Sequence, residues 1–232
     1  MNNLADILKA APYPGRGIAI GTTPDALHGV ILYFIMGRSE GSRNRVFVED
    51  SDGTLSTRVF DGSAAKGDPS LTLYNAVKYD SGAVIVSNGT QTDDLFANDE
   101  PISHTLARWD YEGDDLCTPR ISGLLSPTGE AILSILKASN GSGSLSTRHY
   151  FEYPRTAGEA RFISTYDGDN ANPKAFRGEP LRIETPLDVD EIWDALNADT
   201  KVALYIAKFP LGGTQWNYDT VLTHIRNRHK SI

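Results

Sequence analysis

The chain has 232 residues, enough for one large domain or two small ones with a sizeable core. Its net charge of -8 argues against a general affinity for nucleic acid, although a few arginines can still form a local pocket for a small anion. The single cysteine, Cys117, excludes an internal disulfide, and no apolar run is long enough to cross a membrane. The N-terminus also lacks a signal-peptide pattern, so we expect a cytoplasmic protein.

The first half of the chain predicts one short helix followed by hairpins. Leu4, Ile7 and Leu8 have helical spacing that ends at Pro12, and residues 1–12 form an N-terminal extension. The continuous apolar run 30–36 predicts a strand buried on both faces. The predicted strand pairs are 17–21 with 30–36, 45–49 with 54–60, and 71–79 with 83–87.

The second half adds further strands and three helical segments. Residues 94–109 are predicted to be helical with a break at Pro101, Asp188 begins a capped helix, and the spacing of Tyr218, Val221, Leu222 and Ile225 predicts a final amphipathic helix. Strands are predicted at 120–125, 131–137, 147–153, 160–166 and 202–209, with a mobile Gly/Ser-rich loop at 139–146. This order predicts two stacked, mainly antiparallel sheets covered by helices, in a single domain spanning 1–232.

Four segments carry more polar residues than their strand context requires, and we expect them to meet at one cleft. They are residues 13–17, 37–45, 74–75 with 87–93, and 110–120. The arginines, glycines and hydroxyls of 37–45 suit a phosphate group, but a solvated turn would have the same composition. Residues 87–93 open a helix that could face an anion or simply be capped. The acids after the predicted helix end at Trp109 oppose the helix dipole, which favours either a function or a solvated loop.

Short stretches within these segments, taken in chain order, resemble the archaeal-type IMP cyclohydrolases and their bacterial relatives. The stretches are YPGR at 13–16, GRS at 37–39, SRNR at 42–45, YN at 74–75, VSNG at 86–89 with TD at 92–93, DYE at 110–112 with Asp114, TPRI at 118–121 and ISTY at 163–166. The resemblance implies an α+β fold, a four-layer α-β-β-α sandwich like that of the N-terminal-nucleophile hydrolases. It does not imply their mechanism, because the chain begins Met1-Asn2-Asn3.

The resemblance also implies a reaction, the closure of 5-formamidoimidazole-4-carboxamide ribotide to IMP with loss of water in purine biosynthesis. This chemistry needs no metal, redox cofactor or covalent intermediate, and the expected partner is a small purine ribonucleotide, with a homo-oligomer possible. Arg38 and Tyr74 are candidates to donate to the formyl oxygen, and Glu112 to move protons with a pKa raised by packing beside Tyr111 and Trp109.

The residues implied in substrate binding come from the same stretches. They are Tyr13, Arg16, Ser39, Arg43, Asn75, Asn88, Gly89, Asp110, Thr118 and Arg120. Arg16, Arg43 or Arg120 would hold the phosphate, while Asn75, Asn88 and Asp110 would read the base or ribose. Two other functions stay open at this point, an amide or ring hydrolase on another nucleotide-like substrate and a non-catalytic purine nucleotide-binding protein.

Overall fold

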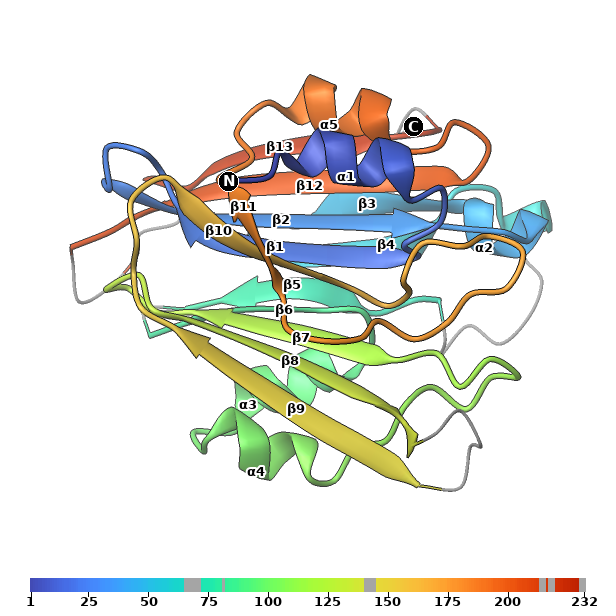
Figure 1. Cartoon of the computed structure of the whole chain (residues 1–232), viewed down its shortest axis with the longest axis horizontal. Coiled ribbons are helices and arrows are strands. Elements are labelled where there is room, and N and C mark those ends of the chain that lie inside the picture. The colour runs from blue at the N-terminus through green and yellow to red at the C-terminus, as the bar shows by residue number, and fades with distance from the viewer. Residues whose placement is uncertain (65–71, 81, 140–144, 213–215, 217–219, 230–232) are drawn as a thin grey trace.

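The computed structural model describes residues 1–64, 72–80, 82–139, 145–212, 216 and 220–229, and in this part of the chain two antiparallel sheets stack face to face (Figure 1). The first sheet contains β1 (Arg16–Thr22), β2 (His28–Met36), β10 (Glu159–Ser164), β11 (Leu181–Glu184), β12 (Lys201–Pro210) and β13 (Leu222–Asn227). Its strand order is β11-β10-β1-β2-β12-β13.

The second sheet has seven strands in simple sequence order. They are β3 (Arg45–Glu49), β4 (Leu55–Val59), β5 (Asn75–Tyr79), β6 (Val84–Ser87), β7 (Arg120–Leu125), β8 (Ala131–Ala138) and β9 (Ser146–Tyr153). Each strand pairs with the next in an antiparallel register, as hairpin connections require.

The central strands of the first sheet are apolar on both faces because each face is covered. Along β2, Ile31 and Tyr33 belong to the core between the two sheets, whereas Leu32 and Phe34 belong to the core beneath the helices. Side chains alternate between the faces of a strand, so a strand enclosed on both sides needs a continuous apolar sequence. The prediction of a doubly buried strand at 30–36 is therefore confirmed.

Short helices lie on the outer faces of both sheets (Figure 1). α1 (Leu4–Ala10) and α5 (Val189–Ala195) cover the first sheet, while α3 (Gln91–Ala97) and α4 (Ile102–Leu106) pack against the second. The one-turn helix α2 (Glu40–Arg43) and the 3-10 turn η1 (Gly62–Ala64) lie between strands. The N-terminal extension is part of the fold, since Leu4 and Leu8 are buried in one apolar cluster with Ile192 and Leu196.

The predicted C-terminal helix is wrong, because Leu222–Asn227 forms the edge strand β13. It pairs with β12 from Leu222 opposite Lys208 to Asn227 opposite Ala203. Val221 and Ile225 pack against the core between the sheets, whereas Leu222 is exposed, as the two-residue period of a strand requires. β-Branched residues at 221, 223 and 225 favour this strand. Tyr218 lies outside the described residues.

The predicted break at Pro101 in the helical segment 94–109 is confirmed, because α3 ends at Ala97 and α4 begins at Ile102. The outer bounds differ from the prediction, since α3 begins at Gln91 and α4 ends at Leu106. Pro101 is the N-cap of α4, where its missing N–H costs no hydrogen bond. Most of the predicted loop 139–146 lies outside the described residues. Among the described residues, no helix is long and apolar enough to cross a membrane.

Candidate active site

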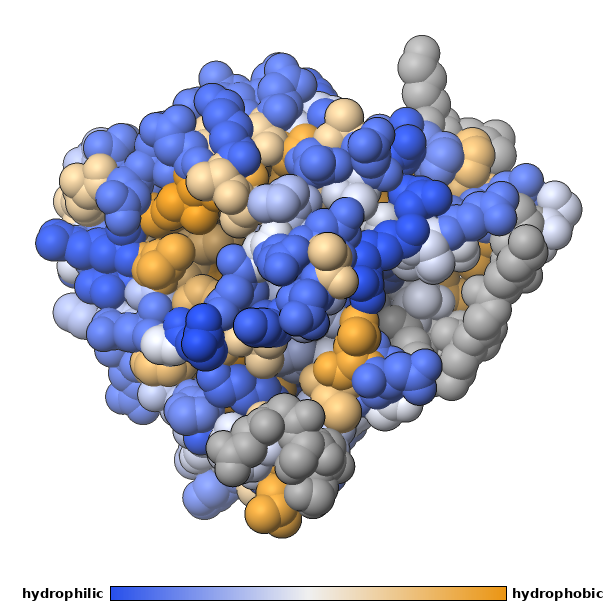
Figure 2. Space-filling view, turned by 45° about the vertical axis from the view of Figure 1, so that its right-hand side comes forward, coloured by the Kyte–Doolittle hydropathy of each residue, from blue (hydrophilic) through white to orange (hydrophobic). Residues whose placement is uncertain are grey.

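A cavity of about 290 Å³ opens at one end of the stacked sheets, where strand ends and loops from both sheets meet. This end lies at the right of Figure 1, and its surface is mostly hydrophilic where Figure 2 turns it toward the viewer. The lining residues are Tyr13, Arg16, Met36, Arg38, Ser39, Ser42, Arg45, Thr72, Glu112, Asp114, Leu116, Thr118 and Tyr166. Arg38 and Glu112, 74 positions apart in sequence, thus line the same cavity.

An ion pair between Arg16 and Glu112 forms the buried floor of the cavity. The Arg16 Nη2 donates to Glu112 Oε1 at 2.6 Å and to Oε2 at 2.8 Å, and only 3% of Glu112 is exposed. Burial raises the pKa of Glu112 above its ordinary value, although Arg16 and Arg120 oppose this effect. Burial would lower the pKa of Arg16, but the Glu112 carboxylate holds it well above the ordinary value, so Arg16 stays charged.

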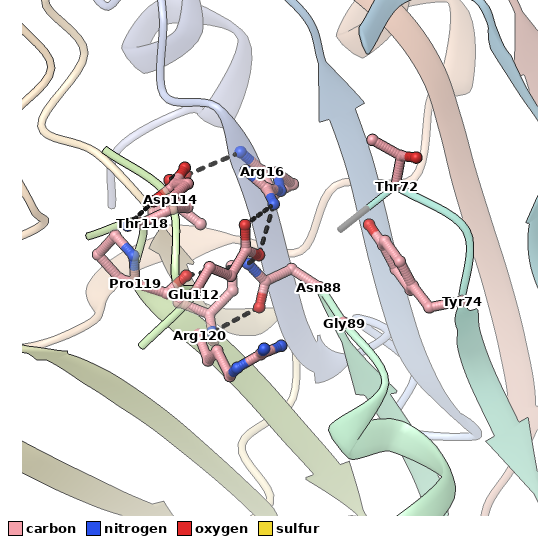
Figure 3. Close-up of polar contacts among 12 residues, drawn as sticks. Arg16, Thr72, Tyr74, Asn88, Gly89, Glu112, Asp114, Thr118, Pro119 and Arg120 are labelled. Atoms are coloured by element: carbon pink, nitrogen blue, oxygen red, sulfur yellow. Dashed lines mark hydrogen bonds and ion pairs between the residues drawn. The ribbon is translucent and has the colours of Figure 1, made fainter. Parts of the chain in front are cut away.

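Asn88 supports Glu112 from behind (Figure 3). Its amide nitrogen donates to Glu112 Oε1 at 3.2 Å and to the Pro119 carbonyl at 2.9 Å, while its oxygen accepts from the Ile121 N–H at 2.8 Å. No part of Asn88 is exposed. Because both ends of the amide bond the protein, Asn88 positions Glu112 and the chain that follows it.

Arg120 and Gly89 belong to the same supporting network. Arg120 Nη1 donates to Gln91 Oε1 at 2.9 Å, and the Gln91 amide donates to Asn88 Oδ1 at 3.3 Å. A Cβ on Gly89 would lie 2.3 Å from Arg120 Nη1, so only glycine leaves room for the guanidinium. Arg120 also lies over the Trp109 ring at 5.0 Å. The network therefore connects the start of α3 to the loop that carries Glu112.

The loop from Glu112 to Thr118 is closed by its own hydrogen bonds. The Glu112 N–H donates to the Thr118 carbonyl at 2.8 Å, and the Thr118 hydroxyl bonds both Asp114, at 2.5 Å, and the Tyr166 hydroxyl, at 2.6 Å. α4 ends at Leu106, so the acids belong to this loop and not to a helix terminus at Trp109. The direction expected for the pKa of Glu112 agrees with the structure, but the cause is burial of the carboxyl group at the cavity floor, and the contact with Arg16 opposes it.

Tyr74 and Arg38 come from opposite sheets, Tyr74 just before β5 and Arg38 just after β2. The Tyr74 hydroxyl bonds the Tyr33 hydroxyl at 2.7 Å, and both rings are buried. Tyr74 itself is not among the lining residues, although it lies two residues after Thr72, which is. Arg38 is exposed at the cavity rim, with its guanidinium 5.3 Å from the centre of the Tyr13 ring.

Six of the ten residues implied in substrate binding lie outside the lining. Asn88, Gly89 and Arg120 belong to the supporting network described above, and the other three bond other groups. Arg43 donates to the carbonyls of Gly37 and Arg38. Asn75 donates to Asp93 at 2.9 Å, and Asp110 pairs with Arg148 of β9 at 3.0 Å. Tyr13, Arg16, Ser39 and Thr118 do line the cavity.

Comparison with known proteins identifies the family of the chain. Residues 13–210 match the family described as IMP cyclohydrolase-like protein. The chain belongs to this family. The IMP cyclohydrolase of Halobacterium salinarum is 25% identical over 219 residues, which cover 91% of this chain and 98% of that protein. The IMP cyclohydrolase of Methanosphaera stadtmanae is 26% identical over 67% of this chain and 74% of its own length. That of Methanocaldococcus jannaschii is 31% identical over 49% of this chain and 56% of its own length.

The family match begins at residue 13, so α1 lies outside it. Within the match, sequence reasoning did not select Met36, Ser42, Arg45, Thr72, Asp114, Leu116 and Tyr166, which also line the cavity. Arg45 was visible as the last residue of the polar segment 37–45, but its strand position suggested a residue of the hairpin. Tyr166 is the last residue of the stretch ISTY. It follows the end of β10, which pairs with β1, and it lines the cavity.

Proposed function

We propose that this protein is an IMP cyclohydrolase that closes 5-formamidoimidazole-4-carboxamide ribotide to IMP with loss of water. The observation that carries the proposal is a buried carboxyl group, Glu112, that lines a polar cavity and is fixed by Arg16 and Asn88. Burial raises its pKa toward the range where a carboxyl group exchanges protons efficiently near neutrality.

Ring closure needs two proton transfers, and one carboxyl group can make both. As the carboxamide nitrogen bonds the formyl carbon, Glu112 takes a proton from that nitrogen and delivers it to the formyl oxygen, giving a carbinolamine. The carboxylate then takes the proton of the formamide nitrogen and returns it to the hydroxyl, which leaves as water as the new C=N bond forms. The same group thus serves as base and acid in each step.

Arg38 and Tyr74 have the complementary task of stabilising negative charge on the formyl oxygen. Arg38 lines the cavity and Tyr74 lies two residues from the lining residue Thr72, and preorganised hydrogen-bond donors lower the barrier where charge develops. Tyr13, Ser39 and Thr118 of the lining would contact the bound nucleotide. Asn88 and Arg120 would act through Glu112, because their polar groups already bond the protein.

The finer features of the architecture belong to the same proposal. Helices outside two stacked antiparallel sheets support a four-layer α-β-β-α sandwich of the N-terminal-nucleophile hydrolase type, formed by residues 1–232 as one domain. Ring closure of a nucleotide precursor is metabolic chemistry, which supports a cytoplasmic location for the proposed activity. A small purine ribonucleotide would be the partner, and a homo-oligomer is compatible with the site.

A ring-closure assay tests the function directly. The ultraviolet spectrum of the formamido ribotide should change to that of IMP when the protein is added, at a rate proportional to protein concentration. Hydrolysis of the formyl group without closure would instead support an amide hydrolase. Binding of IMP with no turnover of the ribotide would support a non-catalytic nucleotide-binding protein.

A further inference from the structure

The cavity holds more positive charge than the protein itself neutralises. Three arginines line it, Arg16, Arg38 and Arg45, and Arg16 is paired with Glu112. Asp114, the other lining carboxylate, accepts from the backbone and hydroxyl of Thr118. Among the residues that the structure describes, neither Arg38 nor Arg45 forms an ion pair with a carboxylate. In a protein of net charge -8, this concentration of positive charge requires an explanation.

Arg45 is the more unusual of the two because it is buried. Only 3% of it is exposed, and its Nε donates to the Ser42 carbonyl at 2.8 Å. Within the described residues this is the one hydrogen bond of its guanidinium, so the two terminal nitrogens are left to the cavity that Arg45 lines. A buried charge without a counter-charge is costly, and an anion in the cavity would offset that cost.

The arginines implied by the family resemblance are already engaged. Arg16 holds Glu112, Arg43 bonds backbone carbonyls outside the cavity, and Arg120 bonds Gln91 and the Asp110 carbonyl. Arg45 differs from all three, since its forked donors face an open space. Ser39 and Ser42, at α2, also line the cavity and add hydroxyl groups near Arg45 in the sequence.

We propose that Arg45 binds the phosphate group of the nucleotide, at the end of the cavity next to α2. This assignment rests on the proposed function for the identity of the ligand, but its basis is the buried, unneutralised guanidinium. Arginine suits a phosphate because its planar fork makes two parallel, charge-assisted hydrogen bonds. The phosphate at Arg45 would leave the base to extend toward Glu112, which lines the same cavity.

Comparison of IMP with inosine tests the phosphate site, because the two ligands differ only in the phosphate. In the unsubstituted protein, IMP should bind much more tightly than inosine by calorimetry. Arg45→Met should raise the Kd for IMP by roughly 10–100-fold, the usual effect of losing hydrogen bonds to a charged group, and leave the Kd for inosine unchanged. Arg45→Lys should retain part of the difference. The control Arg58→Met removes an exposed arginine of β4 that pairs with Asp50, and should keep both Kd values.

Two further results make the test decisive. If Arg45→Met does not fold, inorganic phosphate should still compete with IMP, but not with inosine, in the unsubstituted protein. An unchanged IMP-to-inosine ratio in folded Arg45→Met, or phosphate that competes equally with both ligands, would overturn the assignment. Failure of the proposed function can be distinguished from failure of the Arg45 assignment. In the first case the ribotide is not turned over, even if Arg45 discriminates IMP from inosine.

Discussion

The Arg16 guanidinium donates to both oxygens of the Glu112 carboxylate, and this contact joins the first strand of one sheet to a loop preceding β7 of the other. The pair has opposing effects on the chemistry. Burial raises the pKa of Glu112, while the positive charge of Arg16 limits that rise. Arg16 therefore both orients the carboxylate and limits how far the pKa of Glu112 rises.

Arg16→Met should move the acidic limb of the kcat–pH profile to higher pH. The proposed base must be deprotonated, so activity falls as the pH drops through the pKa of Glu112. Removing the charge that lowers this pKa raises it further, and the limb follows. The profile is measured from pH 5 to 9 on folded protein. A limb at the wild-type position would show that Glu112 does not govern it.

Asn88→Ala should lower kcat by roughly 10–100-fold through misplacement of Glu112, with a smaller change in KM. The substitution also leaves the buried Ile121 N–H without its acceptor, which should cost about 1–3 kcal/mol of unfolding free energy. Asn227→Ala provides the control, because Asn227 bonds the Phe47 backbone in the same two-sided way outside the cavity lining. Equal losses of kcat in the two variants would contradict a positioning role for Asn88.

Leu8→Ala should reduce the free energy of unfolding by about 2–5 kcal/mol, the usual cost of a large cavity in a core. Leu8 is buried between α1 and the first sheet, on the outer face and away from the cavity lining. Activity per folded molecule should therefore persist, as measured by kcat below the transition temperature. The exposed Leu27→Ala should change stability by less than about 0.5 kcal/mol. A stability loss no larger than that of Leu27→Ala would show that the extension is dispensable.

The parts of the fold predicted from sequence are those whose pattern has one interpretation. A seven-residue apolar run such as 30–36 fits a strand covered on both faces, and it is one. The edge strand β13 was misread because Val221, Leu222 and Ile225 have helical spacing, while Val221, Thr223 and Ile225 have the two-residue spacing of a strand. Only its backbone pairing with β12, a contact between distant segments, decides between the two.

The site shows a similar division. Glu112 was selected because it occurs in a stretch that resembles the family, but its contacts with Arg16 and Asn88 link residues 96 and 24 positions apart. Arg45 was not selected because the pattern assigned it to the strand predicted at 45–49. Its candidacy as a phosphate ligand depends on its burial and on the absence of a carboxylate partner among the described residues. Neither property can be predicted from the neighbouring residues in the sequence.

The rate of IMP formation by Glu112→Gln, compared with the unsubstituted protein, tests the account most directly. Glutamine keeps the shape of the side chain but cannot carry the proton, so kcat should fall by roughly 10²–10⁴-fold. Glu159→Gln is the matched control, since Glu159 also pairs with arginines, Arg161 and Arg182, but outside the cavity lining, and it should retain wild-type turnover. A folded Glu112→Gln protein that forms IMP at a rate close to that of Glu159→Gln would contradict the proposed mechanism.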